Sequence, residues 1–340
     1  MPGPLVDADP TDLLRLLAVP AFAWAAYRDI ATRRVSNVVW VPLTAFALAL
    51  LAWDAWTAWT AGEFVWRRFL VPTAVSVGLV VPLAYLFWWS GGFGGADAKA
   101  LLTLALLIPA YPTYDLPWAT LPVQGTNVGV FSFTVLTNTV LFGMAAPLVL
   151  AARNAAAGRL STTMFVGRPV PVEAVPQTHG RLLSAPDGGT RRGLDLDALR
   201  MYLRWRGVDL STLRANPDAL RNPATLPDDP NPPTDGAVAA APDGGDGSVP
   251  ELDDADGKRA ADGDGEYDDP WGAAAFLADV DGAYGATERD LRDGLQVLST
   301  AETVWVSPGV PFLVPTFVGL AVALTYGDVL FGLFELLGVV

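Results

Sequence analysis

Long apolar runs recur along this chain and limit what it can fold into. The run Phe69–Trp89 contains no charged side chain, and the run Val38–Trp56 contains one, Asp54. About 20 consecutive apolar residues are what a helix needs to cross the hydrocarbon core of a bilayer. Because hydrophobic residues also make up 51% of the 340 positions, we expect a membrane to surround most of the fold.

Six segments have the composition of membrane spans, and the fourth is short enough that a buried or re-entrant helix is an alternative. The sequence therefore predicts an all-α polytopic membrane protein with about six transmembrane helices. Asp7, Asp9 and Asp12 stand where a signal peptide would carry basic residues, so we expect the first span to be retained. The expected spans are Asp12–Tyr27, Val38–Trp56, Phe69–Trp89, Ala98–Tyr111, Val128–Ala152 and Pro311–Leu337.

Basic residues near the span ends predict the orientation, because Lys and Arg in short loops favour the cytoplasmic side. The pair Arg67 and Arg68 opposes the trend but shares its loop with two acidic residues. We expect both chain ends outside and the more basic loops in the cytoplasm, a multi-pass cell-membrane protein. The residues that carry this assignment are Arg28, Arg33, Arg34, Lys99, Arg153 and Arg159.

A soluble α+β insert is expected between spans five and six. Between Leu226 and Asp269 fourteen acidic residues stand against Lys258 and Arg259, a composition that cannot bury enough apolar surface to fold. The expected domains are a transmembrane core over 1–153, a cytoplasmic soluble domain over 154–225, a disordered acidic linker over 226–270, the rest of the soluble domain over 271–308, and a last transmembrane helix over 309–340.

Two elements of the insert can be placed. Asp195–Arg206 carries leucines and aromatic residues at helical spacing, and Thr303–Ser307 has the pattern of a short strand. The arginines of the helix could bind anionic headgroups or a partner, or form a solvated basic face.

The composition also excludes several kinds of site. The chain has no cysteine, which excludes disulfides, thiolate metal sites and cysteine nucleophiles. A single histidine, His179, cannot supply a histidine-rich zinc site. We therefore expect no metal and no cofactor, and carboxylates remain as the candidates for acid–base chemistry.

The net charge of the chain limits the kinds of partner that it can bind. The formal net charge is −14, and lysine occurs only at Lys99 and Lys258. An acidic surface with few lysines suggests a halophilic source, and it argues against nucleic acid as a partner.

One carboxylate, Asp97, follows a glycine-rich turn at the edge of an apolar run. The segment Ser90–Ala100 reads Ser-Gly-Gly-Phe-Gly-Gly-Ala-Asp-Ala-Lys-Ala. Asp97 could cap the next helix through the backbone N–H of Lys99 or Ala100. A second carboxylate, Asp29, at the matching end of another span makes a joint role the alternative.

Asp29 has a structural interpretation of its own. It lies four residues before Arg33, the spacing of an ion pair on a helix. Arg33, Arg34 and Asn37 could equally be an interfacial anchor and a helix cap. If Asp29 and Asp97 meet, however, the two carboxylates share one proton, and such a pair can hydrolyse a peptide bond: the ionised member takes a proton from water and the protonated member polarises the carbonyl.

The two motifs together resemble the type IV prepilin peptidase family. In that family an Asp precedes a basic, Asn-containing loop, here Asp29 with Arg33-Arg34-Val35-Ser36-Asn37, and a Gly-x-Gly-Asp motif with a following Lys opens a later span, here Gly94-Gly95-Ala96-Asp97-Ala98-Lys99. Six spans and an insert before the last resemble the archaeal preflagellin (archaellin) and prepilin peptidases. Ala96 departs from the consensus, which has glycine there.

The resemblance implies an aspartic endopeptidase of the membrane. Its catalytic residues would be Asp29 and Asp97, and its substrate-binding or loop-shaping residues would be Gly94, Gly95, Lys99, Arg33 and Asn37. Its partners would be precursor filament subunits, prepilins or preflagellins, whose short basic leader is cut at the cytoplasmic face. The competing hypothesis is a non-catalytic multi-pass transporter or filament-assembly partner that uses Asp97 as a cation site.

Overall fold

The computed structural model describes residues 7–32, 35–90, 93–126, 129–238, 267–280, 282–309 and 311–339. The chain divides into two compact units. Unit 1 comprises Met1–Ala146 and Val310–Val340, and unit 2 comprises Pro147–Gly309. Most of the expected acidic linker, residues 239–266, lies outside the described residues.

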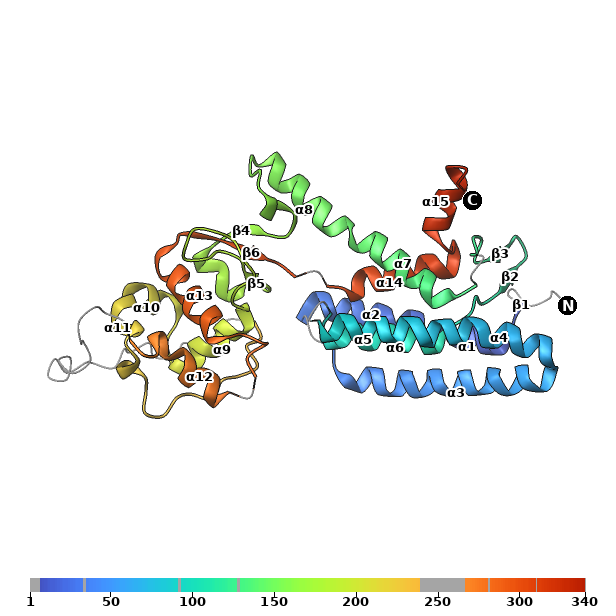
Figure 1. Cartoon of the computed structure of the whole chain (residues 1–340), viewed down its shortest axis with the longest axis horizontal. Helices are drawn as coiled ribbons and strands as arrows, with labels where there is room; N and C mark the ends of the chain where they lie inside the picture. Colours follow the sequence, from blue (N-terminus) through green and yellow to red (C-terminus); the bar gives the residue numbers. More distant parts are fainter. Residues whose placement is uncertain are drawn as a thin grey trace. The chain divides into compact units, whose positions relative to one another are not determined.

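Unit 1 is a bundle in which long helices run alongside one another (Figure 1). A small antiparallel sheet, in the order β1-β2-β3, lies near the chain's N-terminal end. The elements of unit 1 are β1 Asp7–Ala8, α1 Pro10–Arg15, α2 Ala18–Thr32, α3 Asn37–Ala61, α4 Glu63–Val75, the π-helical turn η1 Ser76–Val80, α5 Val81–Trp89, α6 Gly95–Leu107, β2 Tyr114–Leu116, β3 Ala119–Leu121, α7 Phe131–Gly143, α14 Leu313–Thr325 and α15 Val329–Leu336.

Among the described residues, three helices are long and apolar enough to cross a membrane. They are Val38–Ala61, Glu63–Trp89 and Phe131–Ala156, at the second, third and fifth expected spans. The last of them continues from α7 into α8, Ala145–Ala156. The chain is therefore a mostly helical membrane protein, and membrane crossing by the other three segments stays a prediction.

Those other three segments are shorter in the structure. A turn at residues 16–17 separates α1 from α2, and α6 has 13 residues. The last expected span is two helices, α14 and α15. The chain breaks there because Gly327 adopts a positive φ of 104° and Asp328 caps α15, its Oδ1 accepting the Phe331 N–H at 3.0 Å.

The core of unit 1 joins helices that are far apart in the sequence. Helix α14 packs against α2 and α7, and α6 packs against α3 and α5. The buried side chains at these contacts include Phe22, Trp40, Leu104, Phe131 and Leu320. This packing brings the start of α14 to the end of α2, where the candidate site lies.

Unit 2 is an α+β unit whose sheet has the antiparallel order β4-β6-β5. The expected strand over Thr303–Ser307 is β6, which confirms that prediction. The other elements are η2 Thr162–Phe165, β4 Arg168–Pro171, η3 Val172–Gln177, β5 Arg181–Leu182, α9 Leu196–Arg206, α10 Leu210–Ala215, α11 Pro217–Arg221, η4 Pro223–Thr225, η5 Pro270–Gly272, α12 Ala273–Asp279 and α13 Glu288–Thr300.

The helix expected over Asp195–Arg206 is α9, with Asp195 as its N-cap. Its last arginine, however, points inward. Arg206 is 4% exposed and donates hydrogen bonds to the Tyr202 hydroxyl (2.6 Å) and the Trp271 carbonyl (2.7 Å). For Arg206, both the headgroup-binding and the solvated-face interpretations are therefore wrong: the guanidinium joins α9 to η5.

Candidate functional site

Asp29 continues the buried face of α2. The fully buried residues Ala18, Phe22 and Ala25 recur at intervals of four and three, and Asp29 follows Ala25 by four. Residues at that spacing lie on one face of a helix. The carboxylate is thus directed to the same side as the apolar residues that hold α2 in the bundle.

The Asp29 carboxylate meets the beginning of α14. The backbone N–H of Leu313 donates a hydrogen bond to Asp29 Oδ2 at 3.2 Å. Leu313 is the first residue of α14 and is fully buried. The first N–H groups of a helix have no partner within it and carry partial positive charge. This end of α14 therefore suits the ionised form of Asp29.

Asp97 occupies the first turn of α6. Its Oδ2 accepts the backbone N–H of Gly94 at 3.0 Å, so it reaches back to the N-cap residue from the third position of the helix. The sequence suggested a cap on Lys99 or Ala100, and the contact runs in the other direction. The half-buried Asp97 lies on the same face as the buried Ala100 and Leu104.

The surroundings of Asp97 favour its neutral form. Asp97 precedes the expected span Ala98–Tyr111, and burial raises the pKa of its carboxyl from 3.8 to about 6. The hydrogen bond from Gly94 lowers the pKa, and the negative charge of Asp29 raises it again. The two carboxylates are therefore near enough to affect each other's ionisation.

Gly94 and Gly95 differ in the space available for a side chain at each position. A Cβ on Gly94 would lie 3.1 Å from Asp97 Oδ2, whereas a Cβ on Gly95 would meet nothing nearer than Lys99 Nζ at 3.9 Å. Ala96 lies within α6 and packs against the core, so the alanine that replaces the consensus glycine is accommodated by ordinary helical backbone.

The expected loop residues beyond Asp29 are only partly described. Arg33 lies outside the described residues, and Asn37 is the first residue of α3. The cap of α3 is Ser36, whose hydroxyl accepts the Val38 N–H at 3.3 Å.

Three aromatic rings connect the two aspartate-bearing regions. The Phe93 ring lies 4.9 Å from that of Phe87 at the end of α5 and 4.6 Å from that of Phe312 at the start of α14. Phe93 directly precedes Gly94, and Phe312 directly precedes Leu313. No sequence pattern indicated this contact, because it joins residues far apart in the chain.

One known protein family matches the part of the chain that carries both aspartates. A model of the type IV leader peptidase family matches residues 16–156, a range that includes Asp29, Gly94 and Asp97. Residues 16–156 are therefore similar to the type IV leader peptidase family. A search of curated proteins gives no match. Members of this family are aspartic-type proteases that act on prepilin-like substrates.

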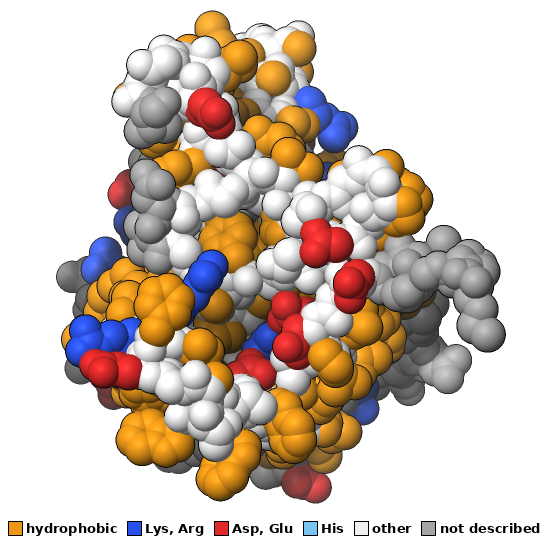
Figure 2. Space-filling model, turned by 90° about the vertical axis from the view of Figure 1, so that its right-hand side faces the viewer, with side chains coloured by type: hydrophobic (Ala, Val, Ile, Leu, Met, Phe, Trp, Pro, Cys, Tyr) orange, Lys and Arg blue, Asp and Glu red, His pale blue; other side chains and the backbone are white. Residues whose placement is uncertain are grey.

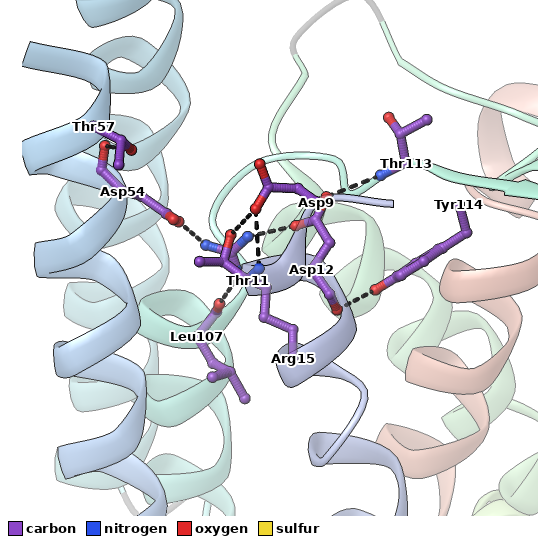
Figure 3. A network of polar contacts seen from close by, with 9 residues as sticks. All are labelled: Asp9, Thr11, Asp12, Arg15, Asp54, Thr57, Leu107, Thr113 and Tyr114. Carbon is purple, nitrogen blue, oxygen red and sulfur yellow. Dashed lines mark hydrogen bonds and ion pairs between the residues drawn. The ribbon is translucent and has the colours of Figure 1, made fainter. Parts of the chain in front are cut away.

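Other acidic residues of unit 1 lie at the far end of α6. Arg15, 8% exposed, donates through Nε to the Leu107 carbonyl at 2.8 Å and forms ion pairs with Asp12 and Asp54 (Figure 3). Leu107 ends α6, whereas Asp97 lies in its first turn. Asp12 and Asp54 are therefore structural partners of Arg15.

More carboxylates gather on the surface of that same end. Figure 2 shows acidic side chains there among hydrophobic ones. Asp7 and Asp115 are exposed and face each other across β1 and β2. Asp328 is 2% exposed and accepts the Thr134 hydroxyl at 2.8 Å, beyond the opposite end of α14 from Asp29. None of these groups belongs to the candidate pair.

The cavity of unit 2 offers no acid–base group, and the described residues offer no metal-binding cluster. A cavity of about 410 Å³ in unit 2 is lined by Gly188, Thr190, Gln296, Trp305 and neighbours, with no titratable side chain among them. No group of three or more His, Cys, Asp or Glu residues that could hold a metal ion occurs in the described part of the chain.

Proposed function

We propose that this chain is a leader peptidase in which Asp29 and Asp97 form the catalytic pair of an aspartic endopeptidase. The observation that carries the proposal is that two carboxylates, remote in sequence, lie at one end of the helical bundle, near enough for the charge of Asp29 to raise the pKa of Asp97. Each accepts a backbone N–H at the start of a different helix, and the charge of Asp29 acts on Asp97.

The surroundings of the two carboxylates support different roles for Asp29 and Asp97. The α14 N-terminus stabilises negative charge on Asp29, which then serves as the base that takes a proton from water. The raised pKa of Asp97, about 6, keeps a proton on that residue in weakly acidic solution, and Asp97 donates this proton to the oxygen of the scissile carbonyl. Since one proton is shared by the pair, the apparent pKa values belong to the pair.

Hydrolysis then follows with a balanced set of bonds. The water oxygen bonds to the carbonyl carbon as Asp29 takes the water proton and Asp97 gives its own to the carbonyl oxygen. Asp29 then protonates the leaving nitrogen, the C–N bond breaks, and a proton from the tetrahedral intermediate returns to Asp97. The products are a leader with a new carboxylate and a mature subunit with a new amine.

The proposed substrate is a type IV prepilin-like or archaellin precursor. Its apolar helix would lie among the helices of unit 1 and its short basic leader would extend into the cytoplasm. This orientation rests on the basic residues Arg28, Lys99 and Arg153, which place the ends of α2 and α6 that carry the aspartates on the cytoplasmic side of a multi-pass fold.

The test is cleavage of a candidate precursor by membranes that contain the full chain, read by N-terminal sequencing of the product. We expect Asp29→Asn and Asp97→Asn each to abolish leader removal without lowering the amount of protein in the membrane. Asp115→Asn is the matched control, because this exposed carboxylate lies on β2 and bonds only locally to Thr120. Equal cleavage by the wild type, Asp29→Asn and Asp97→Asn would reject the proposal.

A further inference from the structure

The amide groups that bind the two aspartates are each one residue away from a phenylalanine, and these two phenylalanines are in contact. Gly94, which binds Asp97, follows Phe93; Leu313, which binds Asp29, follows Phe312. The ring centroids are 4.6 Å apart with an interplanar angle of 41°. The contact thus joins the support of one carboxylate to the support of the other.

The Phe93 side of this contact is fixed to a long helix. The Phe93 N–H donates to the Phe87 carbonyl at 3.0 Å, and the two rings lie 4.9 Å apart. Phe87 belongs to α5, the end of the membrane-length helix Glu63–Trp89. The loop before α6 is therefore held on α5, and α14 is held on that loop.

The two rings also close a small apolar cluster. Phe93 and Phe312 are half-buried and pack on the buried side chains of Ala84, Leu101 and Leu136. These belong to α5, α6 and α7, so the cluster connects these three helices to the residue that precedes α14. Aromatic pairs have a preferred separation and angle. The contact therefore sets the distance between the segments that carry the two rings, in addition to burying apolar surface.

We propose that Phe93 and Phe312 are positioning residues that set the distance between Asp29 and Asp97 by holding the Gly94 loop against the N-terminus of α14. The inference rests on the proposed function. A pair of carboxylates shares one proton only while the two groups stay close. Loosening the ring contact lets the two supports move apart and leaves each carboxylate on its own helix end.

The kinetic test uses Phe93→Ala, Phe312→Ala and the double variant of the full chain in proteoliposomes with a purified precursor. We expect each single variant to lower kcat at least tenfold while KM changes less than twofold, since the rings position catalytic groups. We expect the double variant to be no more than about threefold slower than the worse single one, because both changes break the same contact. Losses that multiply, or a KM effect with unchanged kcat, would overturn the proposal.

Two sets of variants keep this test decisive. Phe331→Ala removes a ring from an aromatic contact on α15 and serves as the control for loss of an aromatic residue. If the alanine variants do not fold, Phe93→Leu and Phe312→Leu keep apolar volume but lack the ring contact, and we expect the same kcat loss with an unchanged melting temperature. Full activity of the folded leucine variants would assign the rings to packing alone.

A distance measurement separates this inference from the peptidase proposal. The chain has no cysteine, so spin labels can be placed selectively at Leu102→Cys on α6 and Val314→Cys on α14, two partly exposed positions outside the candidate site. We expect Phe93→Ala to broaden the distance distribution and Phe331→Ala to leave it unchanged. Broadening in a protein that cleaves no precursor would uphold the positioning role and reject the peptidase; an unchanged distribution would reject the positioning role.

Discussion

The amide of Gly94 and the carboxylate of Asp97 are in direct contact, with the N–H donating to Oδ2 at 3.0 Å and no room for a side chain between them. A methyl group at position 94 would lie 3.1 Å from that oxygen, closer than ordinary van der Waals contact. The φ of Gly94 is −70°, so glycine is needed here for space and not for backbone freedom.

Gly94→Ala is therefore expected to lower cleavage activity at least several-fold by displacing the Asp97 carboxylate. Gly95→Ala is the matched control and should retain nearly full activity, because its new methyl group would meet only Lys99 Nζ at 3.9 Å. Initial rates of precursor cleavage by the two variants at equal protein amounts provide the measurement. Similar activity of the two variants would contradict the steric argument.

Asp97→Asn is expected to stabilise the fold while removing activity. The folded pKa of Asp97 is about 6 against 3.8 for the unfolded group, so the folded state binds more protons between these values. The wild-type stability contributed by this residue is fully present below pH 3.8 and is lost as the pH rises to about 6. Asparagine does not titrate and avoids this loss, which amounts to at most roughly 3 kcal/mol.

Thermal unfolding in detergent at pH 4 and pH 7 measures this effect. The melting temperature of Asp97→Asn should exceed that of the wild type at pH 7, and the difference should shrink at pH 4. A variant that is less stable than the wild type at pH 7 would show that the ionised carboxylate contributes to folding.

The pH dependence of cleavage should follow the shared proton. Only the singly protonated pair is active, so kcat/KM should decline as the pH rises above about 6 and Asp97 loses its proton. It should also decline in acid, once both carboxylates are protonated. Initial rates from pH 4 to pH 9 on one precursor test this, with the melting temperature recorded at each pH to exclude unfolding. A flat profile between pH 5 and pH 9 would refute the assignment of Asp97 as the acid.

Part of the candidate site could be read from the sequence because local spacing determines it. The interval of four and three from Ala18 through Phe22 and Ala25 to Asp29 places the carboxylate on the inner face of any helix. The glycines before Asp97 likewise predict a turn that directly precedes this carboxylate. The strand Thr303–Ser307 and the helix after Asp195 follow from alternation and capping in the same way.

The rest depends on contacts that no short pattern records. The donor to Asp29 is the backbone of Leu313, and any residue except proline has that N–H. The contact of Phe93 with Phe312 and the pairing of Arg15 with Asp54 join distant segments through packing. The break in the last helix had a readable signal, Gly327 followed by Asp328, but the apolar residues around it suggested one continuous span.

Arg15→Met should destabilise unit 1. Arg15 is 8% exposed and bonds to Asp12, Asp54 and the end of α6, so its removal leaves two largely buried carboxylates, 15% and 17% exposed, without their cation. Loss of one member of a buried ion pair costs about 3–5 kcal/mol. Arg67→Met is the matched control, because its ion pair with Glu63 is about three-quarters exposed and such pairs contribute less than about 1 kcal/mol. Denaturation midpoints in detergent compare the two, and equal shifts would contradict this account of the Arg15 network.

Gly319→Ala tests whether the position of α14 controls the site from a distance. A Cβ on Gly319 would lie 2.8 Å from both the backbone nitrogen and the hydroxyl of Thr139 on α7, and the backbone cannot move aside alone. The two helices must therefore separate. Because the first residue of α14 binds Asp29, this shift should lower kcat as well as stability. Gly143→Ala faces Pro315 across the same pair of helices at 3.9 Å and should change neither. Cleavage rates and melting temperatures of both variants are the measurement, and a destabilised Gly319→Ala protein with wild-type kcat would mean that Asp29 does not depend on the seating of α14.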